Sequence, residues 1–121
     1  MGVIEKIRNL LRSKTEAEIQ SFEDELRGRF GFEEFLYATV EGLPITGTFS
    51  SYEELSAKVP EVVKILSELE PSGNYTIIVG ERVYTLLTIS GEVLMLARGK
   101  KILTADEIQE LIMRSRAELG I

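Results

Sequence analysis

The chain has 121 residues, enough for one domain with its own hydrophobic core. Its net charge of −6 argues against nucleic-acid binding, because such proteins need a basic face to displace counterions from phosphates. The sequence has no cysteine and no histidine, which excludes disulfides, zinc sites built on these residues, and Ser–His or Cys–His nucleophile pairs. We find no apolar run long enough to span a bilayer and no signal-peptide core, so we expect a cytoplasmic protein without cofactors.

The first segment, residues 3–12, has apolar residues at helical spacing on one side and basic residues on the other. We expect residues 1–14 to be an amphipathic helical extension of a domain that spans residues 15–121. A helix this short must dock to persist, and packing on its own domain or on a second subunit is favoured. The alternative is a partner-docking or membrane-surface role, carried by Lys6, Arg8, Arg12 and Lys14.

The second helix is expected to begin at Thr15, where Thr15 and Glu18 have the spacing of a capping box, with Gly28 and Gly31 marking its end. Its buried stripe would consist of Ile19, Phe22 and Leu26. Two strands follow, at residues 35–40 and 44–49, joined by a turn at Glu41–Gly42. Pro44 cannot donate a hydrogen bond to a neighbouring strand, so the second of these strands should lie at an edge of the sheet.

The third helix is expected over residues 51–70, with Ser50 and Ser51 as its cap and Pro60 inside it. An internal proline removes one helical hydrogen bond, so we expect a kink or a restart near Val59. The broad apolar stripe of this helix consists of Leu55, Val59, Val62, Val63, Leu66 and Leu69.

Residues 74–98 read as three consecutive strands separated by glycine turns, which is typical of an antiparallel meander. The middle run, residues 83–89, is apolar at nearly every position, which indicates a strand covered on both faces. A last helix should begin at a capping box formed by Thr104 and Glu107. The sequence therefore predicts an α+β fold, a five-stranded antiparallel sheet sandwiched between helices.

The order of elements over residues 15–119 resembles the roadblock (dynein light chain) family, a relative of the longin and profilin-like folds. The resemblance rests on the turn Glu41-Gly42-Leu43-Pro44-Ile45, on the long helix over residues 52–69, and on the strand pair 75–79 and 83–89. The extra helix at residues 1–14 and the proline at position 60 depart from the family pattern.

The resemblance implies a non-enzymatic scaffold that forms a homodimer and binds a small Ras-like GTPase or a similar signalling or motility partner. The dimer would use the strand 75–79 and the long helix, with Tyr75, Ile77, Val79, Leu55, Val62 and Leu66 in the interface. The partner would meet the outer face of the long helix, with Glu53, Glu54, Glu61, Lys64 and Glu68. The strand 75–79 reads as an apolar edge that needs covering, and in a monomer the helix at residues 3–12 would cover it.

Three alternatives remain open from the sequence. The first is a module that senses a small molecule between sheet and helix, although the expected interior has few polar groups to orient a ligand. The second is an adaptor held at a membrane surface by the basic first helix. The third is an enzyme. Whether the protein would accelerate GTP hydrolysis, inhibit it or only recruit the GTPase is left open, with Arg82 and Arg98 as arginine candidates that the spacing does not separate. The turn Arg98-Gly99-Lys100-Lys101 fails the phosphate-loop pattern, and no acid–base pair stands out.

Overall fold

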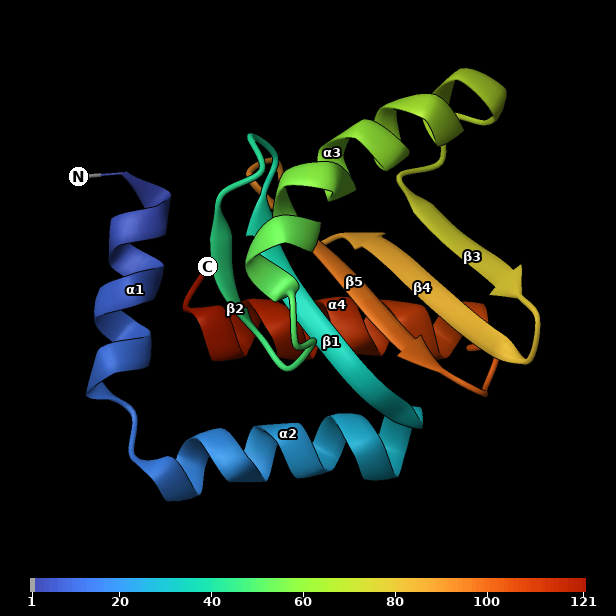
Figure 1. Ribbon diagram of the computed structural model, residues 1–121. Coiled ribbons are helices and arrows are strands. Elements are labelled where there is room, and N and C mark those ends of the chain that lie inside the picture. The colour runs from blue at the N-terminus through green and yellow to red at the C-terminus, as the bar shows by residue number, and fades with distance from the viewer. Residues whose placement is uncertain (1) are drawn as a thin grey trace.

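The computed structural model describes residues 2–121, so Met1, the first residue of the expected extension, lies outside the described residues. These residues form one antiparallel sheet with the strand order β2-β1-β5-β4-β3, together with helices, which confirms the predicted fold class (Figure 1). The helices are α1 (Val3–Ser13), α2 (Glu16–Phe30), α3 (Tyr52–Leu69) and α4 (Ala105–Leu119). The strands are β1 (Phe32–Thr39), β2 (Pro44–Gly47), β3 (Asn74–Val79), β4 (Arg82–Thr88) and β5 (Val93–Gly99).

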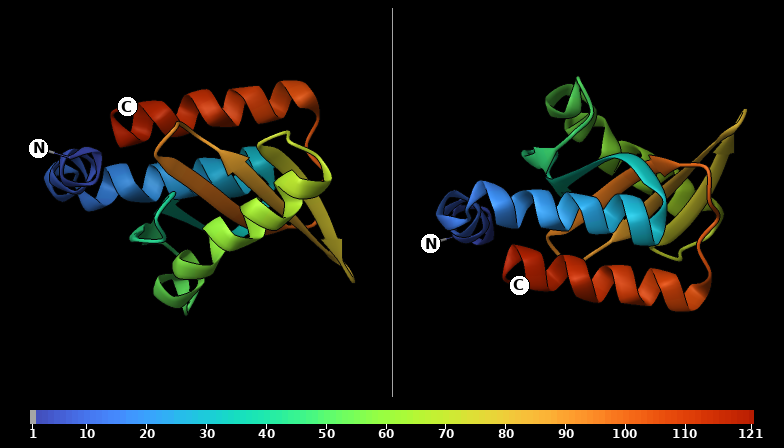
Figure 2. Two further views of the ribbon diagram at one scale, coloured as in Figure 1. Left: turned by 90° about the horizontal axis from the view of Figure 1, so that it is seen from above. Right: turned by 90° about the horizontal axis from the view of Figure 1, so that it is seen from below.

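The sheet separates two helical layers, with α2 and α4 on one face and α3 on the other (Figure 2). Side chains on a strand alternate between the faces, so neighbouring residues of β1 enter different cores. Tyr37 belongs to the core under α2 and α4, whereas Leu36 belongs to the core under α3. Across the helical layer, the Arg114 Nε of α4 donates to Glu25 of α2 at 2.7 Å, and this hydrogen bond raises the pKa of Arg114.

Both edges of the sheet are the ones that the sequence predicts, with β2 at one end and β3 at the other. In β4, Val83, Leu86 and Leu87 are buried, as expected for a strand with helices on both sides. Tyr84 is the exception, because its side chain points to a part of the sheet that α3 leaves open and is only half-buried.

The helix caps agree with the predictions only in part. Thr104 and Glu107 form the complete capping box of α4. At α2, the Thr15 side chain accepts a hydrogen bond from the Glu18 backbone amide at 3.1 Å. This is one of the two hydrogen bonds of the predicted capping box. The helix ends at Phe30 with Gly31 as its C-cap at a φ of 72°, which confirms the predicted end, and Gly28 lies inside the last turns of the helix. Ser51 occupies the N-cap of α3 without a side-chain hydrogen bond.

Two further expectations fail. Pro60 lies inside α3 without ending it, so the helix runs continuously and the restart expected near Val59 is absent, while the alternative of a kink stays a prediction. Ile19 is exposed rather than buried, because the burial of α2 is centred on Phe22, Leu26 and Phe30.

Helix α1 packs on α4 and β2 of its own domain. Ile7 is fully buried in the core under α2 and α4, and the Lys14 Nζ lies 3.2 Å from a carboxylate oxygen of Glu118. The Arg8 guanidinium donates to the carbonyl oxygen of Pro44 at 3.3 Å. Because β2 and β3 are opposite edges, α1 does not cover β3, and the expectation that it would do so in a monomer is wrong.

Candidate partner-binding surface

The edge strand β3 is paired through its backbone on one side only, with β4. Its last two residues are apolar and exposed, Ile78 to 63% and Val79 to 58%. At its other end, the Tyr75 hydroxyl donates to the carbonyl oxygen of Glu70 at 2.6 Å, which holds the start of the strand against the end of α3. The strand therefore presents both unpaired backbone groups and apolar side chains.

Helix α3 covers only part of its face of the sheet. It packs on β1, β2 and β5, and its C-terminal part extends beyond the sheet core (Figure 1). Of the six residues in the predicted apolar stripe, only Val59 is buried; Leu55, Val63 and Leu66 are half-buried, and Val62 and Leu69 are exposed. Ile65, outside that stripe, is 61% exposed, and Leu69 is 78% exposed.

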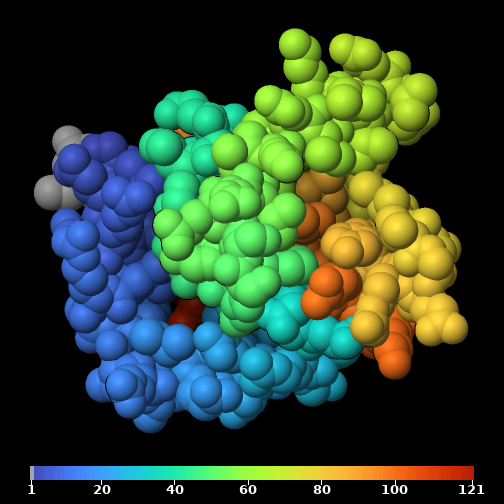
Figure 3. Space-filling view, in the orientation of Figure 1, coloured from blue at the N-terminus to red at the C-terminus, as the bar shows by residue number. Residues whose placement is uncertain are grey.

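A groove of about 280 Å³ runs between α3 and the uncovered strands. Figure 3 shows this region, with atoms of β4 and β5 visible between α3 and β3. Four of the six predicted interface residues line the groove, whereas Leu66 and Tyr75 pack on the core under α3. The lining residues are Leu55, Lys58, Val59, Val62, Ile77, Val79, Tyr84, Leu86 and Leu96. Together with the exposed ends of α3 and β3, the groove forms a nearly continuous apolar surface.

The charged residues predicted to meet a partner all lie exposed on α3. They are Glu53, Glu54, Glu61, Lys64 and Glu68. They flank the exposed apolar side chains of the same helix, so α3 offers a surface of mixed character: apolar where it borders the groove and acidic elsewhere.

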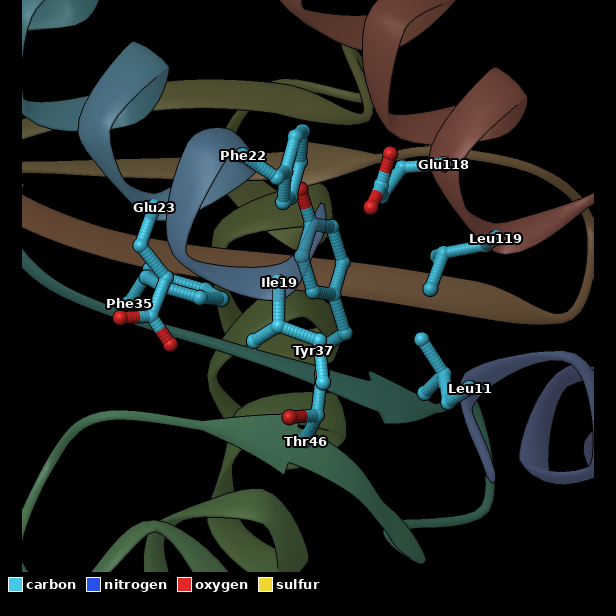
Figure 4. A pocket seen from close by; sticks show the side chains of 9 residues that line it. All are labelled: Leu11, Ile19, Phe22, Glu23, Phe35, Tyr37, Thr46, Glu118 and Leu119. Carbon is cyan, nitrogen blue, oxygen red and sulfur yellow. The ribbon is translucent and has the colours of Figure 1, made fainter. Parts of the chain in front are cut away.

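A second, smaller cavity lies on the other side of the sheet, under α1. Side chains from α1, α2, α4 and the first two strands surround it, with Tyr37 at its centre (Figure 4). Its volume of about 70 Å³ is well below the 300–1,000 Å³ of typical small-molecule pockets. Burial raises the pKa of Tyr37, so the phenol remains protonated at neutral pH. The cavity gives no support to a ligand-sensing module.

Neither a metal site nor a transmembrane helix is found in residues 2–121. No three acidic side chains among them are grouped as a metal ion would require. None of their helices is both long enough and apolar enough to cross a bilayer.

The arrangement of these elements is similar to that of several solved structures. Myxococcus xanthus MglB superposes with a TM-score of 0.64 at 12% identity, covering 88% of this chain and 94% of MglB. A roadblock/LC7 domain from Streptomyces avermitilis gives 0.58 at 10% identity, covering 74% of this chain and 87% of that domain. A structure of MglB with a tetrameric arrangement gives 0.58 at 13% identity, covering 85% and 84%. The chain has the roadblock fold.

The similarity is one of structure and not of sequence. No protein-family model matches the sequence, and no curated protein matches it either. The roadblock fold nevertheless confirms the resemblance based on the element order and on the turn at residues 41–45. Within this fold, β3 and α3 supply the exposed apolar surface, whereas α1 lies at the other edge of the sheet.

Proposed function

We propose that this roadblock-fold protein is a non-enzymatic homodimeric platform that binds and regulates a small Ras-like GTPase. The observation that carries the proposal is the apolar surface formed by β3 and the C-terminal part of α3. Ile65, Leu69, Ile78 and Val79 are all more than half exposed there. Clustered apolar side chains beside an unpaired strand edge are typical of an interaction surface.

A second copy of the chain fits this surface. Pairing of two β3 strands about a two-fold axis would satisfy their free backbone groups and extend the sheet through both subunits. The interface would contain Tyr75, Ile77 and Val79 of β3 and Leu55, Val62 and Leu66 of α3. The similarity to MglB is consistent with self-association, since one MglB structure has a tetrameric arrangement.

The GTPase would meet the outer face of α3, where Glu53, Glu54, Glu61 and Glu68 can face a basic patch on the partner and Lys64 an acidic group. The roadblock resemblance supports this class of partner. Of the two arginine candidates, Arg82 is already paired with Glu33, at 2.7 Å and 3.1 Å to its two carboxylate oxygens. Arg82 would have to leave this exposed ion pair before it could contact a bound nucleotide.

Residues 1–14 would serve as an accessory helix on the domain of residues 15–121. The apolar side of α1 is used by its own domain, through Ile7. Contact with an anionic membrane would therefore depend on the exposed Lys6, Arg8 and Arg12 alone. Each such cation contributes about 1 kcal/mol at an anionic surface, which gives weak, salt-sensitive binding.

The first test is the molar mass of the protein in solution, by light scattering after size exclusion. We expect a dimer, and Ile78→Pro should give a monomer or insoluble protein, because proline removes a backbone donor from the edge strand. A soluble Ile78→Pro dimer would contradict the predicted interface.

The second test is a pull-down with GTP-loaded and GDP-loaded small GTPases from the same genome. Failure to enrich any of them would reject the GTPase as partner while leaving the dimer intact.

A further inference from the structure

A further pocket lies at the N-terminal end of α3. It is separate from the cavity under α1 and differs in chemistry from the apolar groove. It has a volume of about 330 Å³. Its walls come from the start of β1, the end of β5, β4, and the segment that leads into α3. The Arg98 guanidinium carbon lies 5.2 Å from the centroid of the Phe49 ring, so the aromatic face holds the charged group at the wall of the pocket.

The side chain of Arg98, which is half-buried, forms no hydrogen bond to the described residues. Its Nε is buried without a hydrogen-bond partner, and Arg98 takes part in none of the ion pairs formed among residues 2–121. Glu34 is its neighbour across the β1–β5 pair and lines the same pocket, but the two side chains form no ion pair. A buried donor without a partner is destabilising, and a guanidinium offers five donors arranged to fit a carboxylate. The pocket is therefore short of an acceptor beside Arg98.

The surroundings of Arg98 also favour an anion. Ser50 and Ser51 line the pocket, and Ser51 makes no side-chain hydrogen bond to the first turn of α3. The first backbone amides of a helix carry partial positive charge and need acceptors. These groups supplement Arg98, whose guanidinium is the main group in the pocket that can bind a carboxylate.

The Arg98 pocket continues into the apolar groove. Leu55, Tyr84 and Leu96 line both. The two together contain the cations Lys58 and Arg98 and a single carboxylate, Glu34, although the chain as a whole has a net charge of −6. An occupant with an acidic side chain next to an apolar one would therefore complement both parts.

We propose that the Arg98 pocket binds an aspartate or glutamate side chain of a partner protein, whose adjacent apolar side chain enters the groove beside Tyr84 and Leu96. The proposal goes beyond the GTPase platform, because it does not depend on a dimer or on a bound nucleotide. It assigns the recognition of a carboxylate to Arg98 and leaves Arg82 in its ion pair with Glu33.

A separate partner fits the pocket better than a second copy of the chain. β5 lies two strands in from the β3 edge, roughly 10 Å at the usual strand spacing. Along α3, the pocket at Ser51 is roughly 20 Å from the exposed Ile65, at 1.5 Å per residue. A two-fold contact centred on β3 and the C-terminal part of α3 would therefore reach the pocket at Leu55 only and leave Arg98, Tyr84 and Leu96 open to a separate partner.

The experiment uses a random peptide library displayed on phage and selected against the full-length protein. We expect the selected peptides to contain an acidic residue beside an apolar one. Binding of these peptides to Arg98→Gln should weaken at least about ten-fold, since a charge-assisted, two-pronged contact is lost. Arg82→Gln is the matched control and should bind as the wild type does. Arg98→Met, which keeps an aliphatic side chain against Phe49, serves as a second variant.

Peptide binding can also be located on the wild-type protein, so that the test does not depend on whether the variants fold. In nuclear magnetic resonance titrations, a selected peptide should shift the amide signals of Ser50, Ser51 and Arg98 more than those of α4. The proposal is overturned if selection yields no binder or peptides without acidic residues, or if the shifts lie elsewhere. It is also overturned if Arg98→Gln binds as tightly as the wild type, or if that variant loses dimerisation, which would make the second copy the occupant. Shifts with inorganic phosphate but with no peptide would indicate a free-anion site instead.

Discussion

The phenol oxygen of Tyr37 lies 2.6 Å from the hydroxyl oxygen of Ser115, and both side chains are fully buried. Tyr37 lies in β1 and Ser115 in α4, so this hydrogen bond joins the sheet to the last helix across the larger core. Each hydroxyl satisfies the other where no solvent reaches them. The Sδ of Met95 is 4.0 Å from the Ser115 oxygen and completes this small polar contact.

Removal of either hydroxyl should destabilise the protein. Ser115→Ala leaves the Tyr37 hydroxyl without its partner in an apolar core, which costs about 1–3 kcal/mol of the free energy of unfolding. Tyr37→Phe should have a similar effect. The double variant should lose less than the sum of the two, because neither polar group is then left unpaired. Urea denaturation of the four proteins measures this coupling, and strictly additive losses would contradict it.

The stability of the protein should also fall at alkaline pH because of Tyr37. Burial raises the pKa of this phenol above its ordinary value of about 10, so the folded state favours the protonated form. The resulting contribution to stability is complete below pH about 10 and is lost as the pH rises toward the folded-state pKa. Urea midpoints measured from pH 8 to about 11 should therefore fall more steeply for the wild type than for Tyr37→Phe. Parallel curves would show that Tyr37 does not contribute.

Gly99 should not tolerate alanine. A Cβ at this position would lie 2.4 Å from the carbonyl oxygen of Gly31, in the backbone that leads from α2 into β1. Since a backbone atom cannot rotate away, we expect Gly99→Ala to lower the free energy of unfolding by about 1–3 kcal/mol. Gly91 is the matched control, because a Cβ there meets nothing within 4 Å. Gly91→Ala should change stability by less than about 1 kcal/mol, and equal effects at the two positions would refute the argument.

Ile7 should anchor α1 to the domain. It is the one α1 side chain that is fully buried, and Ile→Ala substitutions in cores cost about 2–5 kcal/mol. A helix of this length does not persist alone, so in Ile7→Ala the residues around Ser13 and Lys14 should become accessible to protease. Ile102→Ala, at an exposed isoleucine, is the control and should leave both stability and digestion unchanged. Unchanged digestion of Ile7→Ala would show that α1 does not depend on this contact.

The order of the elements could be predicted from the sequence because it depends on local patterns. Short runs of strand-forming residues separated by glycine turns mark β3, β4 and β5, and Pro44 marks β2 as an edge strand. Which apolar residues of α3 are buried against the sheet could not be predicted in this way. Helical periodicity identifies an apolar face but not what lies opposite it, and α3 extends past the strands that it packs on. Leu69 and Ile65 are therefore exposed although they are as apolar as the buried Val59.

The Arg98 pocket was likewise beyond prediction from the sequence. Glu34, Phe49 and Arg98 are far apart in the chain, and only the pairing of β1 with β5 places Glu34 opposite Arg98. The sequence left Arg82 and Arg98 as equal candidates for contact with a partner. Tertiary structure distinguishes them, because Glu33 pairs with Arg82 and no carboxylate pairs with Arg98 among the described residues.

The exposed end of α3 offers a test of the dimer that spares the strand. Leu69 is 78% exposed, so Leu69→Asp should leave the monomer fold intact but place a charge in the proposed interface, with loss of the dimer. Met113 of α4 is 71% exposed and lies on the other helical layer, so Met113→Asp is a matched control that should remain dimeric. Light scattering over a range of protein concentrations gives the dissociation constant of each variant. If Leu69→Asp and Met113→Asp dimerise equally well, the C-terminal part of α3 lies outside the interface. If both variants become monomers, the contact involves α4 and the proposed arrangement is wrong.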